Sequence, residues 1–277
     1  MNHPRTIQQR YYGLSASDGD GVKLTRIIGQ PQLKNLDPFL MLDAFGTDRP
    51  QDYIGGFPPH PHRGFETVTY LLAGRMRHRD SQGNEGVIEA GGVQWMTAGR
   101  GIIHSEMPEQ QDGLLMGFQL WVNLPAHAKM SEPSYQEFLP HKIPEEVWNS
   151  GTHIKVIAGQ TAKGTQGIIK NRFVYPTYLD VQLQAGDTLE QPIPAGHTAF
   201  IYVHEGAISI GEETLCAKEL GVLSDGDAVR IAATETSRFL LVAGQPLNEP
   251  IVQRGPFVMN TQEEIQQAFD DYQNGRF

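Results

Sequence analysis

Two short motifs carry side chains that can bind a metal ion. His60 and His62 lie two residues apart in HPHRGF, and His104 and Glu106 lie two residues apart in IIHSEMP. On an extended strand, residues i and i+2 point to the same face. Each pair therefore offers two donors on one side of a strand, and two neighbouring strands with a shared interior would bring all four together. The sequence predicts a divalent metal ion held inside a β-barrel.

The donor types restrict which metal such a site would take. Three imidazoles and one carboxylate suit Fe, Mn, Co, Ni, Cu or Zn and fit Ca or Mg poorly. On an octahedral ion, four protein ligands leave two positions open, which oxygen activation or bidentate substrate binding would need. Zinc with four protein ligands more often adopts a closed tetrahedral geometry. The alternative is that both motifs are polar residues on half-exposed strands, but two same-face pairs beside Gly and Pro turns favour the metal site.

Further polar side chains lie close to these motifs in the sequence, namely Arg63, Glu66, Gln94 and Arg100. Glu66 has the same parity as His60 and His62, so its carboxylate could reach the same interior. We expect Glu66 to form a buried hydrogen bond beside the metal ligands rather than to bind the ion.

Large apolar residues near the motifs are candidates for the walls of a pocket. Phe57, Met96 and Phe118 could enclose a flat aromatic ligand. Packing in the core is the commoner fate of such residues, so the sequence leaves both interpretations open.

The segments that must position these residues have the pattern of short strands. Residues 65–72 (FETVTYLL) are rich in β-branched and aromatic types and end at Ala73-Gly74. In residues 118–123, the apolar Phe118, Leu120 and Val122 alternate with Gln119, Trp121 and Asn123. Thirty glycines and 18 prolines recur at the turns between such segments. This pattern predicts an all-β protein.

Other segments with strand character are 6–12, 22–28, 74–80, 87–89, 93–96, 102–106, 153–158, 178–184, 197–204, 207–210, 219–223 and 238–243. We expect a turn and a buried strand within 36–46. Thr261, followed by Glu263 and Glu264, predicts a helix at 261–273 that docks on a barrel, because acidic residues in the first turn favour the helix dipole.

A faint internal repeat indicates a duplicated barrel. Residues 69–80 resemble residues 201–212, and Gly74 and Gly206 lie 132 residues apart. We therefore predict an N-terminal metal-binding barrel at 1–124, a linker at 125–150 with a short helix at its start, and a C-terminal barrel with the terminal helix at 151–277. The second half has no His-x-His motif, so only the N-terminal barrel is expected to hold a metal ion.

Composition excludes several classes of partner. The formal net charge of −10 disfavours direct binding to nucleic acid. With Cys216 as the single cysteine, no internal disulfide can form, which indicates a reducing compartment. The first residues lack the apolar core of a signal peptide, and no apolar run of about 18 residues exists to span a membrane. We expect a cytoplasmic protein without a membrane partner.

Four segments together resemble the pirin family of the cupin superfamily over nearly the whole chain: HPHRGFETVTYLLAG, QWMTAGRGIIHSEMP, FQLWVNLP and GPFVMNTQEEI. The resemblance implies a bicupin, with two face-to-face β-barrels of the jelly-roll type, a C-terminal helix and a metal ion in the N-terminal barrel only. The family's three histidines and one glutamate fall on His60, His62, His104 and Glu106. The broader cupin pattern would instead use a glutamate shortly after His-x-His, which is Glu66 here.

The same resemblance implies two functions. The first is a quercetin 2,3-dioxygenase, an Fe(II)-dependent oxidoreductase that cleaves flavonols such as quercetin with O2, with Glu106 as the catalytic base for the 3-hydroxyl group. Mn, Ni, Co, Cu and Zn remain alternatives to iron. The second is a non-enzymatic, iron-binding and redox-responsive regulator of a transcription factor or a metabolic enzyme. An acidic composition suits such a protein partner better than DNA.

Overall fold

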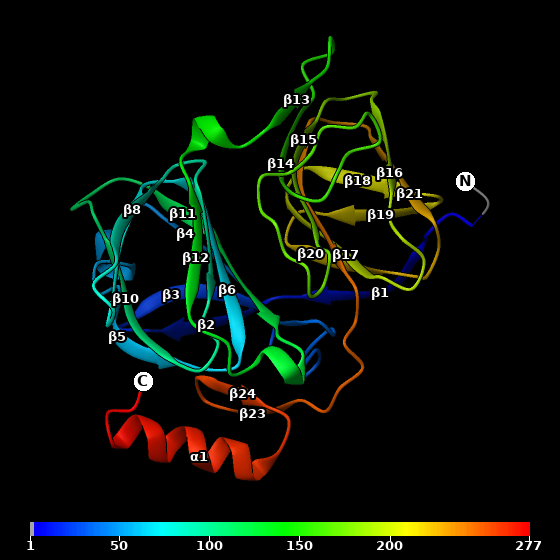
Figure 1. Cartoon of the computed structure of the whole chain (residues 1–277). Coiled ribbons are helices and arrows are strands. Elements are labelled where there is room, and N and C mark those ends of the chain that lie inside the picture. The colour runs from blue at the N-terminus through cyan, green and yellow to red at the C-terminus, as the bar shows by residue number, and fades with distance from the viewer. Residues whose placement is uncertain (1–2) are drawn as a thin grey trace. The chain divides into compact units, whose positions relative to one another are not determined.

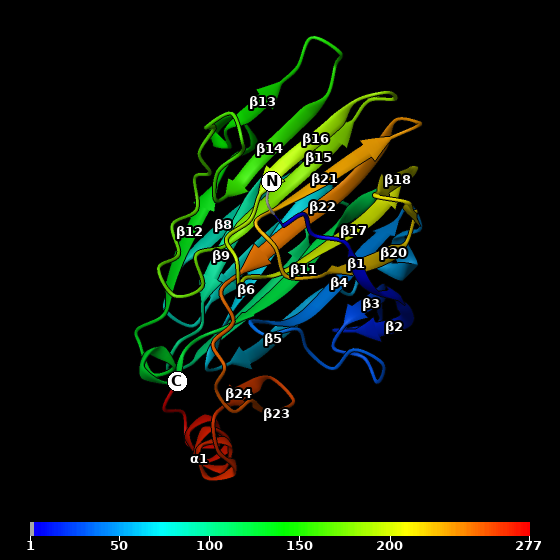
Figure 2. The same ribbon diagram turned by 90° about the vertical axis from the view of Figure 1, so that its right-hand side faces the viewer.

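The computed structural model describes residues 3–277. Contacts divide the chain into two compact units, and each unit combines segments that are distant in sequence. One unit comprises Leu14–Pro140 with Leu247–Phe277, and the other comprises the chain up to Gly13 with His141–Pro246. Strands dominate both units (Figures 1 and 2), which confirms the predicted all-β class with a single C-terminal helix among the described residues.

The unit that contains both histidine motifs has two antiparallel sheets. The larger sheet has the strand order β12 (Ser134–Phe138), β9 (Val93–Thr97), β6 (Phe65–Ala73), β11 (Leu115–Asn123), β4 (Phe39–Thr47), β3 (Val22–Ile28) and β2 (Leu14–Asp18). The smaller sheet has the order β5 (Phe57–His62), β10 (Ile102–Pro108), β7 (Arg75–Asp80) and β8 (Glu85–Glu89). Two short 3-10 helices, η1 (Pro50–Asp52) and η2 (Ala126–Ala128), lie in the connections.

Apolar side chains from both sheets of this unit meet in one core. Leu24, Phe45 and Leu71 come from the larger sheet, and Met76 and Ile88 come from the smaller one. Side chains alternate between the two faces of a strand, so one face of each sheet can be apolar and turned to this core. The pair of sheets thereby encloses an interior, as the predicted barrel requires.

A hairpin and the helix complete the same unit. The hairpin consists of β23 (Val252–Arg254) and β24 (Phe257–Met259), and α1 (Gln262–Gln273) lies beside it in Figures 1 and 2. Helix α1 begins with a capping box, in which the Thr261 side chain accepts from the Glu264 backbone and the Glu264 carboxylate accepts from the Thr261 backbone. Residues Gln262–Gln273 thus form the predicted helix, with Thr261 as its N-cap.

The second unit is also built from two antiparallel sheets. Its larger sheet has the order β1 (Ile7–Tyr12), β20 (Glu219–Leu223), β17 (Thr198–Glu205), β22 (Ser237–Gly244), β15 (Thr177–Leu183), β14 (His153–Ala158) and β13 (Glu145–Val147). Its smaller sheet has the order β16 (Thr188–Pro192), β21 (Ala228–Ala233), β18 (Ala207–Ile210) and β19 (Glu213–Cys216). A third 3-10 helix, η3 (Pro140–Lys142), lies at the division between the units.

The two units share one strand order, element for element. Irregularities in the pairing coincide as well: the register of β3 with β4 shifts between Arg26 and Ile28, and the register of β14 with β15 shifts between Val156 and Ala158. These coincidences fix which positions of the two units are equivalent. They are what a duplicated barrel would leave behind.

The compact units differ from the predicted domain limits at three places. The N-terminal strand β1 pairs with β20, whereas the C-terminal segment from Leu247 groups with the unit that begins at Leu14. The predicted linker at 125–150 contributes an edge strand to each unit, β12 to one and β13 to the other. Strand signals along the sequence locate elements but not the sheet that each joins, which depends on long-range pairing.

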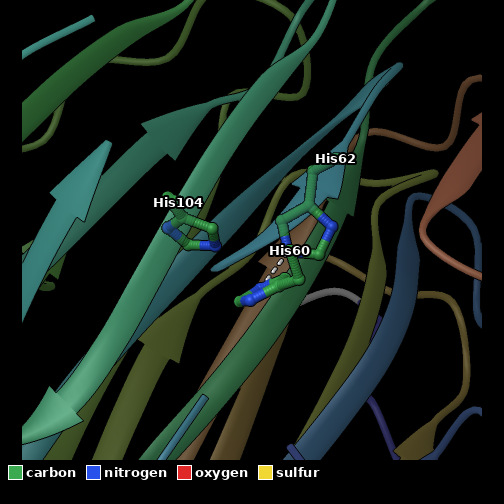
Figure 3. Close-up of side chains that lie close together, drawn as sticks. All are labelled: His60, His62 and His104. Atoms are coloured by element: carbon green, nitrogen blue, oxygen red, sulfur yellow. Dashed lines mark hydrogen bonds between the residues drawn. The ribbon is translucent and has the colours of Figure 1, made fainter. Parts of the chain in front are cut away.

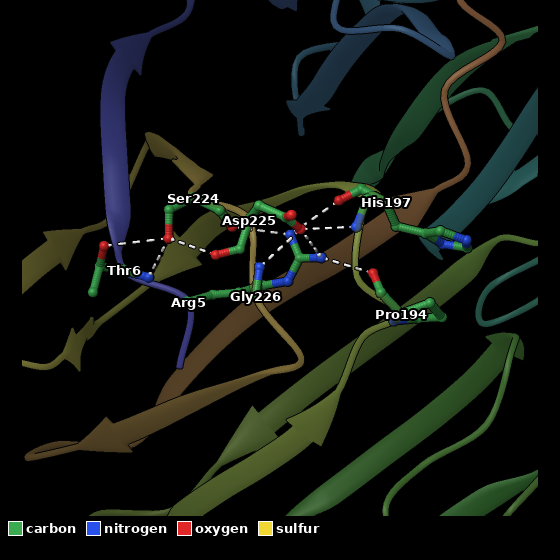
Figure 4. A network of polar contacts seen from close by, with 8 residues as sticks. Arg5, Thr6, Pro194, His197, Ser224, Asp225 and Gly226 are labelled. Atoms are coloured by element: carbon green, nitrogen blue, oxygen red, sulfur yellow. Dashed lines mark hydrogen bonds and ion pairs between the residues drawn. The ribbon is translucent and has the colours of Figure 1, made fainter. Parts of the chain in front are cut away.

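Arg5 anchors the N-terminal segment within its own unit (Figure 4). Its side chain is 1% exposed and donates hydrogen bonds to the carbonyl oxygens of Pro194, His197 and Ser224 at 2.8, 2.9 and 3.0 Å. The carboxylate of Asp225 lies 3.5 Å away. A buried guanidinium needs such acceptors, and together they hold the chain just before β1.

None of the helices within residues 3–277 has the length and apolar character that crossing a bilayer would require.

Candidate metal centre

Strands β5 and β10 bring three histidines to one point. The two strands are antiparallel neighbours in which His104 lies opposite His60 and Ile102 lies opposite His62. The three imidazoles point toward one another (Figure 3), and one ring nitrogen from each lies within 4.8 Å of the others. The Nε2 atoms of His60 and His62 are 3.0 Å apart.

This arrangement fits a metal ion. Two donors that each lie about 2.1 Å from one ion can be at most about 4.2 Å apart, so small side-chain rotations would complete the coordination. His60 Nδ1 lies 2.8 Å from the Pro58 carbonyl oxygen, to which it can donate its hydrogen, and this leaves the Nε2 lone pair directed at the cluster. His104 is 1% exposed, and neither of its ring nitrogens has a hydrogen-bond partner among residues 3–277. A bound cation would give this buried ring the partner that it lacks.

The surroundings favour the neutral form of the two buried imidazoles, His62 and His104. Burial lowers the pKa of His62 well below the usual 6.5, the proximity of His60 lowers it further, and the backbone of Pro256 acts in the opposite direction. Burial likewise lowers the pKa of His104, with further contributions from His62, His60 and His78. Only a neutral imidazole has the free lone pair that a metal ion binds, so the site is prepared for a cation.

Glu106 lies next to the histidines and is held from two sides. It is 2% exposed, and its Oε2 lies 4.0 Å from His104 Nε2. Thr69 donates to Glu106 Oε1 at 2.8 Å, and the Gln119 amide donates to Glu106 Oε2 at 3.0 Å. The structure therefore brings the four sequence-predicted residues together, with the histidines as the tighter group.

A cavity of about 1120 Å³ opens beside this group. Its wall includes His60, His62, Glu106, Thr69 and Gln119, together with the apolar residues Leu40, Met41, Phe57 and Trp121 and the ion pair of Arg26 and Asp43. Cavities of roughly 300–1,000 Å³ hold small organic ligands in proteins. There is room beside the metal group for a molecule of several rings.

The other sequence candidates divide between the wall and the core. Phe57 lines the cavity, whereas Met96 and Phe118 are buried in the packed interior. Glu66 is buried and accepts a hydrogen bond from Thr97 at 2.8 Å, as we expected, but it does not line the cavity beside the histidines.

Arg63, Gln94 and Arg100 form polar contacts away from the histidines. Arg63 pairs with Asp271 of α1 at 2.7 Å and also donates to the carbonyl oxygen of Arg100. Gln94 donates to Glu137 at 2.6 Å, and the Arg100 side chain pairs with Glu132 at 2.9 Å.

The sequence did not indicate Thr69, Gln119, Asp43 or Arg26. These residues lie on β6, β11, β4 and β3, and each becomes a neighbour of the next only through strand pairing. Alternation within one strand shows which residues share a face, but it does not show which strand lies alongside. For Arg26 and Asp43, the available signal was a charged residue in an otherwise apolar i, i+2 row.

Two family models match this chain, one in each half. Residues 21–122 match the family model described as Pirin, and residues 178–277 match the one described as Pirin C-terminal cupin domain. A crystal structure of quercetin 2,3-dioxygenase from Acinetobacter baumannii is similar at a TM-score of 0.91 and 37% identity, covering 99% of this chain and 98% of that one.

Curated relatives agree with this placement. A pirin-like protein from Caulobacter vibrioides is 54% identical over 99% of both chains. The human protein named Pirin is 47% identical over 94% of this chain and 89% of its own. These matches confirm the resemblance to pirins and the two-domain cupin fold. Because both family models match and identity extends across nearly the full length, the chain belongs to the pirin family.

Proposed function

We propose that this protein is an iron-dependent dioxygenase that cleaves a flavonol such as quercetin at the centre formed by His60, His62, His104 and Glu106. The observation that carries the proposal is a buried three-histidine group with an adjacent fixed carboxylate, open to a cavity of about 1120 Å³. The relative from Acinetobacter baumannii is named a quercetin 2,3-dioxygenase, which supports this substrate class.

The four proposed ligands and the cavity wall have different roles: the first would hold the metal ion, and the second would bind the substrate. An Fe(II) ion held by the three histidines and Glu106 would act as a Lewis acid and orient the 3-hydroxyl and 4-carbonyl oxygens of the flavonol. The chain's own part is to bind the rings and to remove the hydroxyl proton. Phe57 and Trp121 offer aromatic surface to a flat ligand, and Leu40 and Met41 extend the apolar wall.

Glu106 is the residue that we assign as the base, and its hydrogen bonds support this role. The Thr69 oxygen lies 2.8 Å from Glu106 Oε1 and 2.9 Å from Gln119 Oε1, and Gln119 Nε2 lies 3.0 Å from Glu106 Oε2. These three contacts form a closed ring, but one hydroxyl and one amide N–H supply only two hydrogens to it. A proton accepted by Glu106 supplies the third. Exchanging the amide oxygen and nitrogen of Gln119 leaves this count unchanged.

The experiment begins with metal analysis of protein purified without oxygen. Oxygen uptake is then measured against a panel of flavonols for the wild type and for Glu106→Gln, each loaded with Fe(II). Because glutamine is close in shape but is not a base, we expect the variant to keep the wild-type circular dichroism and to lose turnover by roughly 100-fold or more.

Two outcomes would contradict the proposal. Turnover that survives in metal-loaded Glu106→Gln would remove Glu106 from the base role. A wild type that binds iron but consumes no oxygen with any flavonol would contradict the dioxygenase itself. It would favour the regulator, for which a stoichiometric protein partner should then be recovered.

A further inference from the structure

A row of polar side chains crosses the larger sheet of the metal-binding unit. Arg26 lies opposite Asp43, Asp43 opposite Gln119, and Gln119 opposite Thr69, on the neighbouring strands β3, β4, β11 and β6. All four residues line the cavity. Residues paired directly across antiparallel strands project from the same face, so the row forms a continuous polar strip on the cavity wall.

The fold itself does not require this strip. In the second unit the equivalent positions pair in the same way: Val156 with Leu179, Leu179 with Leu241, and Leu241 with Ile201. All four are fully buried members of one apolar core. The same strand order and the same bulges thus form around apolar residues, so the polar strip is specific to the unit with the cavity.

Half of the strip already has a role in the metal centre, and the other half does not. Gln119 and Thr69 hold Glu106. Asp43 and Arg26 do not contribute to the histidine group, although a charged carboxylate such as that of Asp43 is costly to bury. Its presence in the wall of a large cavity needs an explanation beyond packing.

The Asp43 carboxylate keeps acceptor capacity that faces the cavity. It is 3% exposed and accepts from Arg26 Nε at 3.0 Å through Oδ1 and from Arg26 Nη2 at 2.8 Å through Oδ2. Each carboxylate oxygen can accept a second hydrogen bond. Burial raises the pKa of Asp43, and the hydrogen bonds from Arg26 offset this effect only in part.

Strand spacing places Asp43 at a useful distance from the metal centre. Neighbouring strands are about 4.8 Å apart, so Asp43 lies roughly 5 Å along the row from Gln119 and roughly 10 Å from Thr69. Glu106 meets the row between these two residues. The span is comparable with the width of a fused two-ring system.

We propose that Asp43, oriented by Arg26, is a ligand-recognition residue that accepts a hydrogen bond from a hydroxyl group on the outer rings of an aromatic ligand bound over the histidine group. The inference rests on the proposed function, because it takes the same cavity as the substrate site. It restricts the substrate class to aromatic compounds that carry a hydroxyl group remote from their metal-binding oxygens.

The test compares two ligands at equilibrium. Quercetin carries outer-ring hydroxyls, and 3-hydroxyflavone keeps the 3-hydroxyl and 4-carbonyl groups but has none. Affinities for the Fe(II)-loaded protein are measured by calorimetry without oxygen. For Asp43→Leu, we expect quercetin to bind roughly 10- to 100-fold more weakly, as for loss of a hydrogen bond to a charged group, and 3-hydroxyflavone to bind as it does to the wild type.

Two further variants control for folding and for loss of charge. Arg26→Val combined with Asp43→Leu reproduces the Val156–Leu179 pair of the second unit and should show the same selective loss with an intact thermal transition. Asp52→Leu removes an aspartate that pairs with Arg49 at 2.6 Å outside the cavity wall, and it should leave both affinities unchanged.

The outcomes separate this inference from the proposed function. Equal losses for both ligands, or no loss for either, would overturn the role of Asp43 while leaving the dioxygenase in place. A wild type that binds neither ligand would overturn both. Quercetin that binds selectively through Asp43 but is not oxidised would support the recognition residue and contradict the dioxygenase.

Discussion

The carboxylate of Glu106 depends on residues that are not themselves metal ligands. Thr69 and Gln119 hold one oxygen each, from strands of the opposite sheet. Groups that fix the orientation of a metal ligand contribute substantially to metal affinity. Gln119 should therefore act as a positioning residue for the centre.

Gln119→Leu tests this role, since leucine is the residue at the equivalent position of the second unit, Leu241. The variant removes the N–H bond to Glu106 Oε2, and we expect metal affinity to fall by about 10- to 100-fold. Competition with a chelator of known affinity measures the change. Ser105→Ala, on β10 between His104 and Glu106, is the control and should bind metal as the wild type does. An unchanged affinity in Gln119→Leu would limit Gln119 to a structural role.

At the scale of residues, the sequence predicted correctly how side chains of the same strand are related. The i, i+2 spacing of His60 and His62 was sufficient to predict a shared face. Counting alternate residues failed across the turn between β5 and β6. Gly64 in this turn has φ +88°, and a β-carbon there would lie 2.0 Å from the Val258 carbonyl oxygen, so the chain turns sharply. Parity counted from the histidines thus does not extend to Glu66.

At the scale of elements, the turn after His62 is held by a buried lysine. Lys129, just after η2, is 1% exposed and donates to Gly64 O at 2.8 Å, Asn123 Oδ1 at 2.7 Å and Val258 O at 3.0 Å. Its ammonium group thereby joins the β5–β6 turn to the end of β11 and to β24. The position of the histidine strand depends on this junction.

The junction predicts a pH dependence in alkaline solution. Burial lowers the pKa of Lys129 from 10.5 to about 8, although Glu249 and Glu264 act in the opposite direction. Between these values the unfolded chain binds more protons than the folded one, so stability rises with pH, by on the order of 3 kcal/mol from pH 8 to 10.5. This contribution is complete above 10.5 and is lost as the pH falls through 8.

Urea unfolding across this range measures the effect as the difference between the wild type and Lys129→Met, which lacks the titrating group. The free energy of unfolding of the wild type should rise relative to that of the variant. Lys23→Met removes an exposed lysine and should follow the wild type. A constant difference between wild type and Lys129→Met would contradict the assignment.

The elements that the sequence predicted are those with local signals. Helix α1 was evident because Thr261 and Glu264 form its cap within four residues. Strands β23 and β24 have three residues each and take their stability from pairing and from packing against α1, so no alternation was long enough to indicate them.

At the scale of the whole molecule, one strand order supports two different interiors. Where β5 and β10 pair His60 with His104, the equivalent strands β16 and β21 pair Gln191 with Val229. Ile231 follows two residues after Val229 and stands in the place of Glu106. Apolar side chains cannot bind a metal ion.

We therefore expect one metal ion per chain. Elemental analysis of the saturated wild type should give a ratio near one, and His104→Ala should give a ratio near zero because the three-histidine group is broken. Gln191→Leu changes the equivalent strand of the second unit and should retain one ion. Two ions per chain, or an ion retained in His104→Ala, would contradict a single centre.

The repeat at Gly74 and Gly206 indicated the duplication, because a glycine that a turn requires can be recognised in both halves of the sequence. No comparable local signal shows which unit each terminal segment of the chain joins. Thr6–Tyr12 has the pattern of a strand wherever it pairs, and only the register of β1 with β20 shows which sheet it completes.

This allocation has a consequence for synthesis on the ribosome. The unit that begins at Leu14 contains all of its barrel strands once residue 140 has been made, but its hairpin and helix lie beyond residue 246. Until those last residues emerge, the Arg63 guanidinium beside the histidine strand lacks its Asp271 counter-charge, and Lys129 lacks the Val258 carbonyl. Cofactor loading in the nascent chain should accordingly wait until residues 247–277 have been made, by which point both units have been translated.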